Sequence, residues 1–273
     1  MTFRLFAFIS HIIASALFPA QLYSQKLPNV QMAGLAPPTN LRIDGKMNDW
    51  NNKFMAFNKN VSLSYSLAND EKFLYLAVQA DDVTVIKKIL AGGVTFIINT
   101  KEKKEKDAIS ITFPFITAEQ ERNMGKLRGE SVRSMKEDWG NDLKKQVRIL
   151  DSISYLNNRV FIDRLKEIKV EGISQMSDNI ISIYNEQGIL ARALFDKDGN
   201  FNYELAVPLA YIPQPANQRI ISYSIKLLGT TANNLPRAPL TLIGPPPPGP
   251  GKRGVDIMTL FSVTNFWSSY TLR

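Results

Sequence analysis

Residues 41 to 50 read LRIDGKMNDW, and residues 61 to 82 read VSLSYSLANDEKFLYLAVQADD. The first stretch predicts a short strand, a tight turn at Asp44-Gly45 and an anchoring aromatic residue, Trp50. In the second stretch, apolar residues alternate with serines up to an Asn-Asp turn, and another strand follows that turn. The two stretches together predict the opening of an antiparallel β-sandwich.

The rest of the chain repeats the pattern of short strands. A short helix is expected after Asp82, ended by Gly92-Gly93. Pro114 indicates that its strand lies at a sheet edge or ends there. Apolar or alternating runs predict further strands at 94–100, 109–115, 167–173, 180–184, 189–195, 201–207, 220–228 and 259–272. We therefore predict a mainly β chain, an antiparallel, jelly-roll-like sandwich.

Two segments do not follow the strand pattern. Residues 117–166 begin with a capping box at Thr117 and Gln120, and their apolar residues then recur at intervals of three and four. This spacing predicts a helical insertion packed on the sandwich. Residues 244–254, GPPPPGPGKRG, cannot pair in a sheet and predict a stiff proline-rich loop. Residues 41–273 then form one domain that contains both segments.

The first residues predict export. Arg4 precedes an apolar run that gives way to polar residues, which is typical of a secretory signal covering residues 1–24. The apolar run is short for a membrane-spanning helix, so no integral membrane protein is expected after cleavage; an uncleaved anchor is the alternative. Residues 25–40 contain three prolines and predict an extended lead-in to the domain. We expect the protein in the periplasm or outside the cell.

The composition excludes several kinds of chemistry. The one histidine, His11, lies in the predicted signal, and the chain has no cysteine. A Ser-His-Asp triad, a Cys-His pair, zinc held by His or Cys, and haem ligated by either residue are thereby excluded. The formal net charge of +8 brings nucleic acid into consideration, but export and the scattered charges argue against it. An anionic envelope polymer fits the charge better.

The opening motif resembles that of a known family. Ile43, Asp44, Gly45, Asp49 and Trp50 form I-D-G-x-x-x-D-W, a later strand ends L-Y-x-A-V, and residues 202–212 resemble a late strand of the form E-x-A-I-P-L. These motifs resemble the family-nine carbohydrate-binding modules and their DOMON-like secreted bacterial relatives. The resemblance implies that Asp44, Gly45, Asp49 and Trp50 are fold determinants, and it implies carbohydrate binding and permits structural calcium. The family's pair of sugar-holding tryptophans has no counterpart here.

Aromatic side chains are the candidates for contact with a sugar, because flat apolar faces stack on pyranose rings. Trp267 lies beside Phe266 in a strand whose alternation cannot place both rings inside, so Trp267 is the best stacking candidate. Tyr270 is a second candidate in the same strand. Trp139 lies on the apolar stripe of the helical insertion, where it is either a core residue or a binder.

Carboxylates are the remaining candidates for metal binding and catalysis. Asp81 and Asp82 lie near turns of the opening motif, where they either bind calcium or only form the turns. Residues 196–200, DKDGN, are better explained by a hairpin turn than by an EF-hand. No catalytic residue is assigned. Acid-base catalysis would require the fold to bring together two carboxylates, for which the candidates are Glu130, Asp138, Glu171 and Glu204.

These observations predict an exported, non-catalytic protein that binds a glycan or an anionic envelope polymer. The alternative is a structural or interaction domain of the cell envelope that has kept the sandwich without sugar binding. A carboxylate-based enzyme acting on glycans is less expected, and no nucleic-acid partner is expected.

Overall fold

The computed structural model of the chain describes residues 26–101, 103–116, 154–155, 157–159, 162–213, 219–229 and 257–273. The predicted signal, Trp139 and the proline-rich loop lie outside these ranges. So does most of the predicted helical insertion, within which residues 154–155 and 157–159 are helical. None of the helices in the described ranges is both long and apolar enough to span a bilayer.

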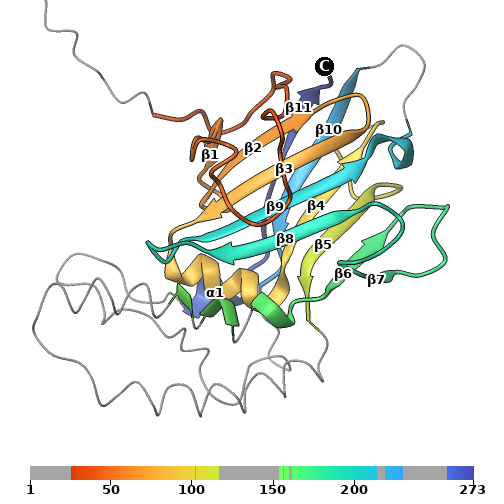
Figure 1. The fold of residues 1–273 in the computed structure, drawn as a ribbon. Helices are drawn as coiled ribbons and strands as arrows, with labels where there is room; N and C mark the ends of the chain where they lie inside the picture. The colour runs from red at the N-terminus through yellow and green to blue at the C-terminus, as the bar shows by residue number, and fades with distance from the viewer. Residues whose placement is uncertain are drawn as a thin grey trace, which may run out of the picture.

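Two antiparallel sheets pack face to face, which confirms the predicted β-sandwich (Figure 1). The five-stranded sheet has the order β1 (Ala56–Asn58), β2 (Leu63–Asn69), β3 (Phe73–Ala80), β9 (Phe201–Pro208), β8 (Leu190–Phe195). The six-stranded sheet has the order β11 (Thr264–Thr271), β10 (Ile220–Leu227), β4 (Val94–Asn99), β5 (Ile109–Phe115), β6 (Glu167–Glu171), β7 (Ile180–Ser182). Sequence alternation had predicted most of these strands because each buries one face between the sheets.

The core lies between the two sheets. Successive side chains of a strand point to opposite faces, so one residue in two enters this layer. In β2 these residues are Leu63, Tyr65 and Leu67, and in β10 they include Tyr223 and Ile225, all fully buried. The intervening residues of each strand face outward, and they alone are available to form a site on the faces of the sandwich.

Short helices lie around the sheets. α1 (Val83–Gly92) closes one end of the sandwich (Figure 1), and Asp82 caps it by accepting hydrogen bonds from two backbone N–H groups of its first turn. Two 3₁₀ turns, Ile162–Arg164 and Leu209–Tyr211, connect strands. The predicted strand at 259–272 is wrong in its first part, where α4 (Ile257–Phe261) stands instead. β11 begins to pair at Thr264 because Thr264 lies opposite Leu227, the last residue of its partner strand β10.

The strand that contains Pro114 is not at an edge. β5 lies between β4 and β6, so the prediction of an edge strand was wrong, whereas the prediction of a strand end was correct. Pro114 is the last residue but one of β5, and the register shifts between Thr112 and Phe115. The missing N–H of proline therefore falls where the ladder is already irregular.

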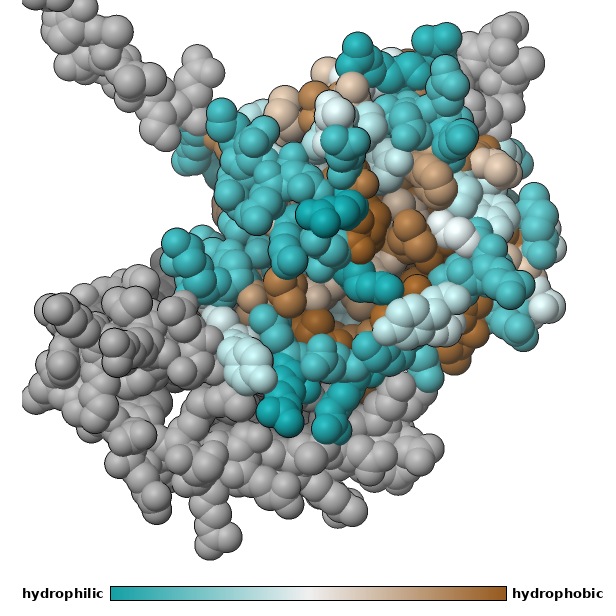
Figure 2. Space-filling view, in the orientation of Figure 1, coloured by the Kyte–Doolittle hydropathy of each residue, from teal (hydrophilic) through white to brown (hydrophobic). Residues whose placement is uncertain are grey.

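The opening motif crosses the outer face of the five-stranded sheet and forms no strand, in contrast to the prediction of a short strand (Figure 1). Met47 and Trp50 pack on Ala68 and Ala77, small residues that leave room for them. Viewed from this side, the molecule shows hydrophilic residues around a central apolar band (Figure 2).

Glu204 of β9 fixes the opening motif in place. One oxygen of its buried carboxylate accepts the N–H groups of Asp44 and Gly45 at 3.0 and 2.7 Å, and the other accepts the indole N–H of Trp50 at 2.8 Å. These bonds explain why the motif does not pair as a strand, because its backbone donors are satisfied by a side chain. The two segments that resemble the family motif thus meet in one hydrogen-bonded cluster.

The predicted lead-in is part of the folded domain. The backbone of residues 28–35 bonds to Phe57 next to one sheet edge and to Thr271 of the other sheet. Gln31 is buried, and its side-chain amide exchanges hydrogen bonds with the backbone of Leu67 at 2.8 Å. This segment therefore closes the open side of the sandwich between β2 and β11.

Candidate functional site

The outer face of the six-stranded sheet carries polar side chains in two neighbouring rows. Residues directly opposite each other on antiparallel strands share a face. From β11 to β6, the first row consists of Trp267, Ser224, Ile97, Ser110 and Glu171. The second row consists of Asn265, Lys226, Thr95, Thr112 and Lys169.

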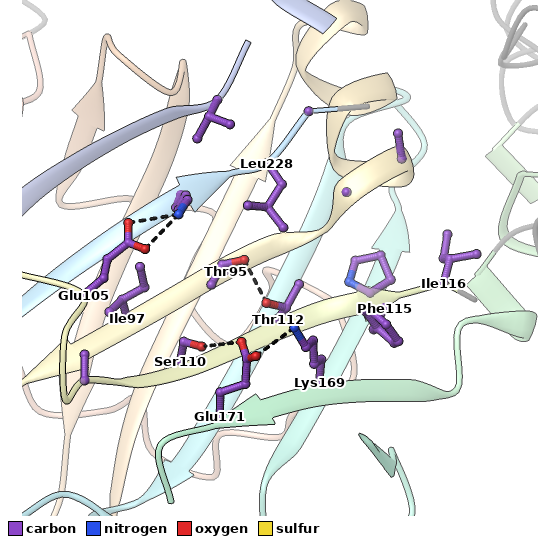
Figure 3. A pocket seen from close by; sticks show the side chains of 17 residues that line it. Thr95, Ile97, Glu105, Ser110, Thr112, Phe115, Ile116, Lys169, Glu171 and Leu228 are labelled. Atoms are coloured by element: carbon purple, nitrogen blue, oxygen red, sulfur yellow. Dashed lines mark hydrogen bonds and ion pairs between the residues drawn. The ribbon is translucent and has the colours of Figure 1, made fainter. Parts of the chain in front are cut away.

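A groove of about 650 Å³ lies over the parts of these rows on β4, β5 and β6, together with Lys226 of β10 (Figure 3). Its volume falls within the range of small-molecule binding pockets. Thr95 and Thr112 lie in the middle of its floor, where their hydroxyls are 2.8 Å apart. Because two hydroxyls share a single hydrogen bond, one hydroxyl proton and several acceptor lone pairs remain for a ligand.

Two ion pairs flank the threonine pair (Figure 3). On the β10 side, Lys226 Nζ lies 2.9 Å from both carboxylate oxygens of Glu105. On the β6 side, Lys169 Nζ lies 2.9 Å from Glu171 Oε1, and Ser110 Oγ donates to Glu171 at 3.2 Å. The hydrogen bond from Lys169 holds the pKa of Glu171 below its usual value. These four charges compensate one another, so the polar part of the groove is electrically balanced.

The groove becomes apolar toward α1. Its lining at this end includes Gly92, Pro114, Phe115, Leu228 and Val263. Leu228 and Val263 are 39% and 57% exposed, so apolar surface is open to solvent here. Figure 3 shows Leu228 and Phe115 toward the helix, with the charged and hydroxyl groups away from it.

Trp267 lies beside this groove. It faces outward from β11 and is half-buried, whereas Phe266 is buried in the core, as the alternation of the strand predicted. In register it stands opposite Ser224, which is in turn opposite Ile97 of the groove floor. Within the described part of the chain, the buried Ser224 Oγ has no hydrogen-bond partner.

Tyr270 does not belong to this face, so the prediction that it stacks on a sugar needs correction. It lies three residues beyond Trp267 and therefore on the opposite side of β11, where it is fully buried. Its hydroxyl accepts the N–H of Leu35 at 3.1 Å and donates to Asn69 at 3.2 Å. Trp139, the remaining aromatic candidate, lies outside the described residues.

The predicted metal candidates act within turns. Asp82 Oδ1 accepts the N–H groups of Thr84 and Val85 at the start of α1, and Asp81 is exposed. Asp70 accepts two backbone N–H groups of its own turn in the same way. Among the residues that the structure describes, no three His, Cys, Asp or Glu side chains come together as metal ligands would. Asp82 thus caps a helix through one oxygen, and Asp70 holds its own turn.

The aspartate-rich hairpin at 196–200 also has the structure of a turn. Asp196 Oδ1 accepts the N–H groups of Asp198 and Asn200, and Asp196 Oδ2 accepts the amide groups of Asn200 and Asn202. Both carboxylate oxygens are thus engaged inside the hairpin between β8 and β9. The interpretation of this segment as a hairpin turn agrees with these contacts.

The carboxylates considered for catalysis do not meet where the structure describes them. Glu204 faces outward from the five-stranded sheet under the opening motif, whereas Glu171 faces outward from the six-stranded sheet. Two stacked sheets lie about 10 Å apart, and both side chains point away from the layer between the sheets. The two carboxylates are therefore separated by the whole thickness of the sandwich. Glu130 and Asp138 lie outside the described residues. The pair formed by Glu171 and Glu204 is therefore excluded as an acid-base couple.

Sequence reasoning missed most of the groove. Ser110 and Thr112 alternate with buried isoleucines, a signal that marked them as outward-facing but not as part of a site. Lys226 likewise alternates with buried Ile225 and Leu227. Thr95 carried no such signal, because its strand is apolar in most positions. Strand order was the missing information, since it alone brings these residues together.

Comparison with known proteins gave one structural similarity. No protein-family model matches the chain, and no curated protein matches it. The chain is similar to the solved structure of a family 9 carbohydrate-binding module from Caldicellulosiruptor kristjanssonii in complex with glucose, with a TM-score of 0.36 and 9% sequence identity. The match covers 89% of this chain and 96% of that module. No comparison supports the DOMON-like part of the resemblance, and the sandwich itself is established by the two sheets described above.

Proposed function

We propose that this chain is an exported, non-catalytic protein that binds a carbohydrate on the outer face of its six-stranded sheet. The observation that carries the proposal is the groove. It combines the Thr95–Thr112 hydroxyl pair with two ion pairs, and a tryptophan, Trp267 of β11, lies beside it.

Each part of the groove matches a part of a sugar. Sugar hydroxyls donate and accept hydrogen bonds, and each ion pair offers a donor in the ammonium and an acceptor in the carboxylate. The two threonine hydroxyls supply further donors and acceptors on the floor. Trp267 supplies a flat apolar ring for the C–H face of a sugar.

Export is supported by the sequence. The first 24 residues have the charge and apolar pattern of a secretory signal. Absence of catalysis is supported by the position of Glu204, whose carboxylate is fully used in holding the opening motif. Glu171 shares the groove with a second carboxylate, Glu105, but each of the two is paired with a lysine.

A glycan array probed with residues 25–273, with and without calcium, tests the proposal. We expect at least one glycan to bind, and we expect Trp267→Ala to weaken that binding about tenfold. Tyr184→Ala is the matched control, because Tyr184 is 70% exposed and follows β7, at the opposite edge of the six-stranded sheet from Trp267 of β11. Thermal unfolding of both variants checks that the fold is intact.

Three outcomes would contradict the proposal. Absence of binding to any glycan favours the interaction domain of the cell envelope. Turnover of a bound glycan shows an enzyme. Equal loss of binding in Trp267→Ala and Tyr184→Ala places the site elsewhere.

A further inference from the structure

The groove changes polarity along the direction of its strands. Glu105, Ser110 and Glu171 lie at the end away from α1, and the threonine pair lies in the middle. Leu228 and Phe115 lie at the end next to α1 (Figure 3). Val263 lies at the same end, because its neighbour Thr264 is paired with Leu227. A ligand that fills the whole groove therefore meets polar groups at one end and apolar surface at the other.

We propose that the ligand is an amphiphile, a neutral sugar that carries an alkyl or acyl chain. This inference rests on the proposed function and adds the apolar part of the ligand to it. The sugar lies over the threonine pair between the two ion pairs. The chain extends over Leu228 and Val263, whose exposed apolar surface it covers.

The exposed residues give the reason for an apolar group. Leu228 and Val263 are 39% and 57% exposed at the mouth of a groove, where a purely hydroxylated ligand would leave their surface unfavourably hydrated. Removing that surface from water strengthens binding by about fourfold for each fully buried methylene of the ligand. An alkyl chain at this end therefore contributes strongly to the affinity of the protein for its ligand.

The ion pairs give the reason for a neutral head group. Lys226 and Lys169 are each within 2.9 Å of a glutamate oxygen. An anionic head would have to displace Glu105 or Glu171, and a cationic head would have to displace a lysine. Neutral hydroxyls bond to both partners of a pair without breaking it.

Calorimetric titration of residues 25–273 with paired glycosides tests this inference. The probes are methyl and octyl β-glucoside, methyl and octyl β-galactoside, and maltose with dodecyl maltoside, each detergent below its critical micelle concentration. Octyl tetraethylene glycol provides the same chain without a sugar. We expect at least one alkyl glycoside to bind more than about tenfold tighter than its chain-free counterpart and than octyl tetraethylene glycol.

Substitutions at the apolar end localise the effect. Leu228→Ser and Val263→Ser are expected to remove the advantage of the alkyl chain while leaving the affinity for the chain-free sugar unchanged. Ile220→Ser is the matched control, because Ile220 is 53% exposed at the start of β10, whereas Leu228 directly follows the end of that strand. It is expected to bind as the unsubstituted protein does.

The outcomes separate the two proposals. Equal affinity for alkyl and chain-free sugars overturns the amphiphile and leaves carbohydrate binding in place. Binding of octyl tetraethylene glycol as tight as that of every glycoside overturns the role of the sugar head. Absence of binding to all probes, together with a negative glycan array, overturns both.

Discussion

The hydroxyls of Tyr65 and Tyr223, which come from opposite sheets, lie 2.8 Å apart inside the sandwich. Gln31 completes the contact, since its N–H donates to Tyr65 at 3.0 Å and its carbonyl accepts from Tyr223 at 2.8 Å. Burial raises the pKa of both phenols, so both stay protonated and able to donate. One closed ring of hydrogen bonds therefore joins both sheets to the N-terminal segment.

Breaking this ring should destabilise the fold. Tyr65→Phe leaves the buried N–H of Gln31 without an acceptor, and we expect a loss of about 2 kcal/mol in the free energy of unfolding. Tyr223→Phe should cost about as much, because it removes the donor to the carbonyl of Gln31. The double variant should cost less than the sum of the two, since both substitutions break the same ring. Urea unfolding measures all three.

Tyr184→Phe serves as the control for the tyrosine variants. Its ring is 70% exposed, and we expect a change of less than about 0.5 kcal/mol. Strict additivity of Tyr65→Phe and Tyr223→Phe would show that the two hydroxyls act independently, contrary to the ring.

The stability of the protein should depend on pH through Glu204. Burial raises the pKa of this carboxyl to about 7, although three N–H donors favour its ionised form. The folded state thus binds the proton more tightly than the unfolded state. This contribution to stability is fully present below about pH 4.5 and is lost as the pH rises through about 7, with an upper bound of about 3 kcal/mol.

Glu204→Gln tests this dependence because glutamine retains the shape of the side chain, while its amide group does not titrate. We expect the unfolding free energy of the unsubstituted protein to fall, relative to that of the variant, between about pH 4.5 and about pH 7. Urea unfolding at several pH values across this window measures the difference. Parallel pH curves for the two proteins would assign the dependence to other groups.

Gly45 and Gly199 form a matched pair for substitution by alanine. Both have positive φ, +84° and +80°, so alanine costs about 1 kcal/mol or more at either position. A Cβ at Gly45 would also lie 2.9 Å from the backbone of Ala193, whereas one at Gly199 meets nothing within 4 Å. We expect Gly45→Ala to cost about 2 kcal/mol more than Gly199→Ala in urea unfolding. Equal costs would mean that the opening motif is not packed tightly on β8.

Trp50→Ala should destabilise the domain by about 3 to 5 kcal/mol, as for other large-to-small core changes. Trp50 is 5% exposed, and its loss also leaves one oxygen of Glu204 without its indole donor. Trp267→Ala is the comparison, since its half-buried ring lies outside the core and should cost less than about half as much. A stable Trp50→Ala variant would contradict the placement of the motif.

The sequence predicted the strands better than the arrangement of the opening motif. Alternation in β2 and β10 reports directly which residues enter the core, because burial on one face imposes a period of two. The motif at 41–50 has no such period, since its backbone is held by Glu204, a residue 159 positions from Gly45. A contact of that range leaves no local pattern, so the segment was assigned to a strand that does not exist.

Of the candidate site, the sequence predicted Trp267, which lies beside the groove, but not the residues that line the groove. Trp267 was selected correctly as the outward ring of its strand, because alternation distinguishes it from Phe266. Tyr270 was misassigned, although it lies an odd number of positions from Trp267 and so points the other way. The ion pair between Lys226 and Glu105 depends on β10 lying beside β4, which alternation does not determine. The other pair, Lys169 and Glu171, is local to β6, but only the strand order brings it to the same groove.

The docking of residues 28–35 has a consequence for how the chain acquires its structure. The partners of this early segment include Tyr223 and Tyr270, which are 192 residues from Gln31 and 235 residues from Leu35. Such distant contacts close late and slow folding. This early segment therefore cannot complete its contacts before β10 and β11 have been made. Such a delay suits the export proposed above, because an exported chain passes a translocation channel before it folds.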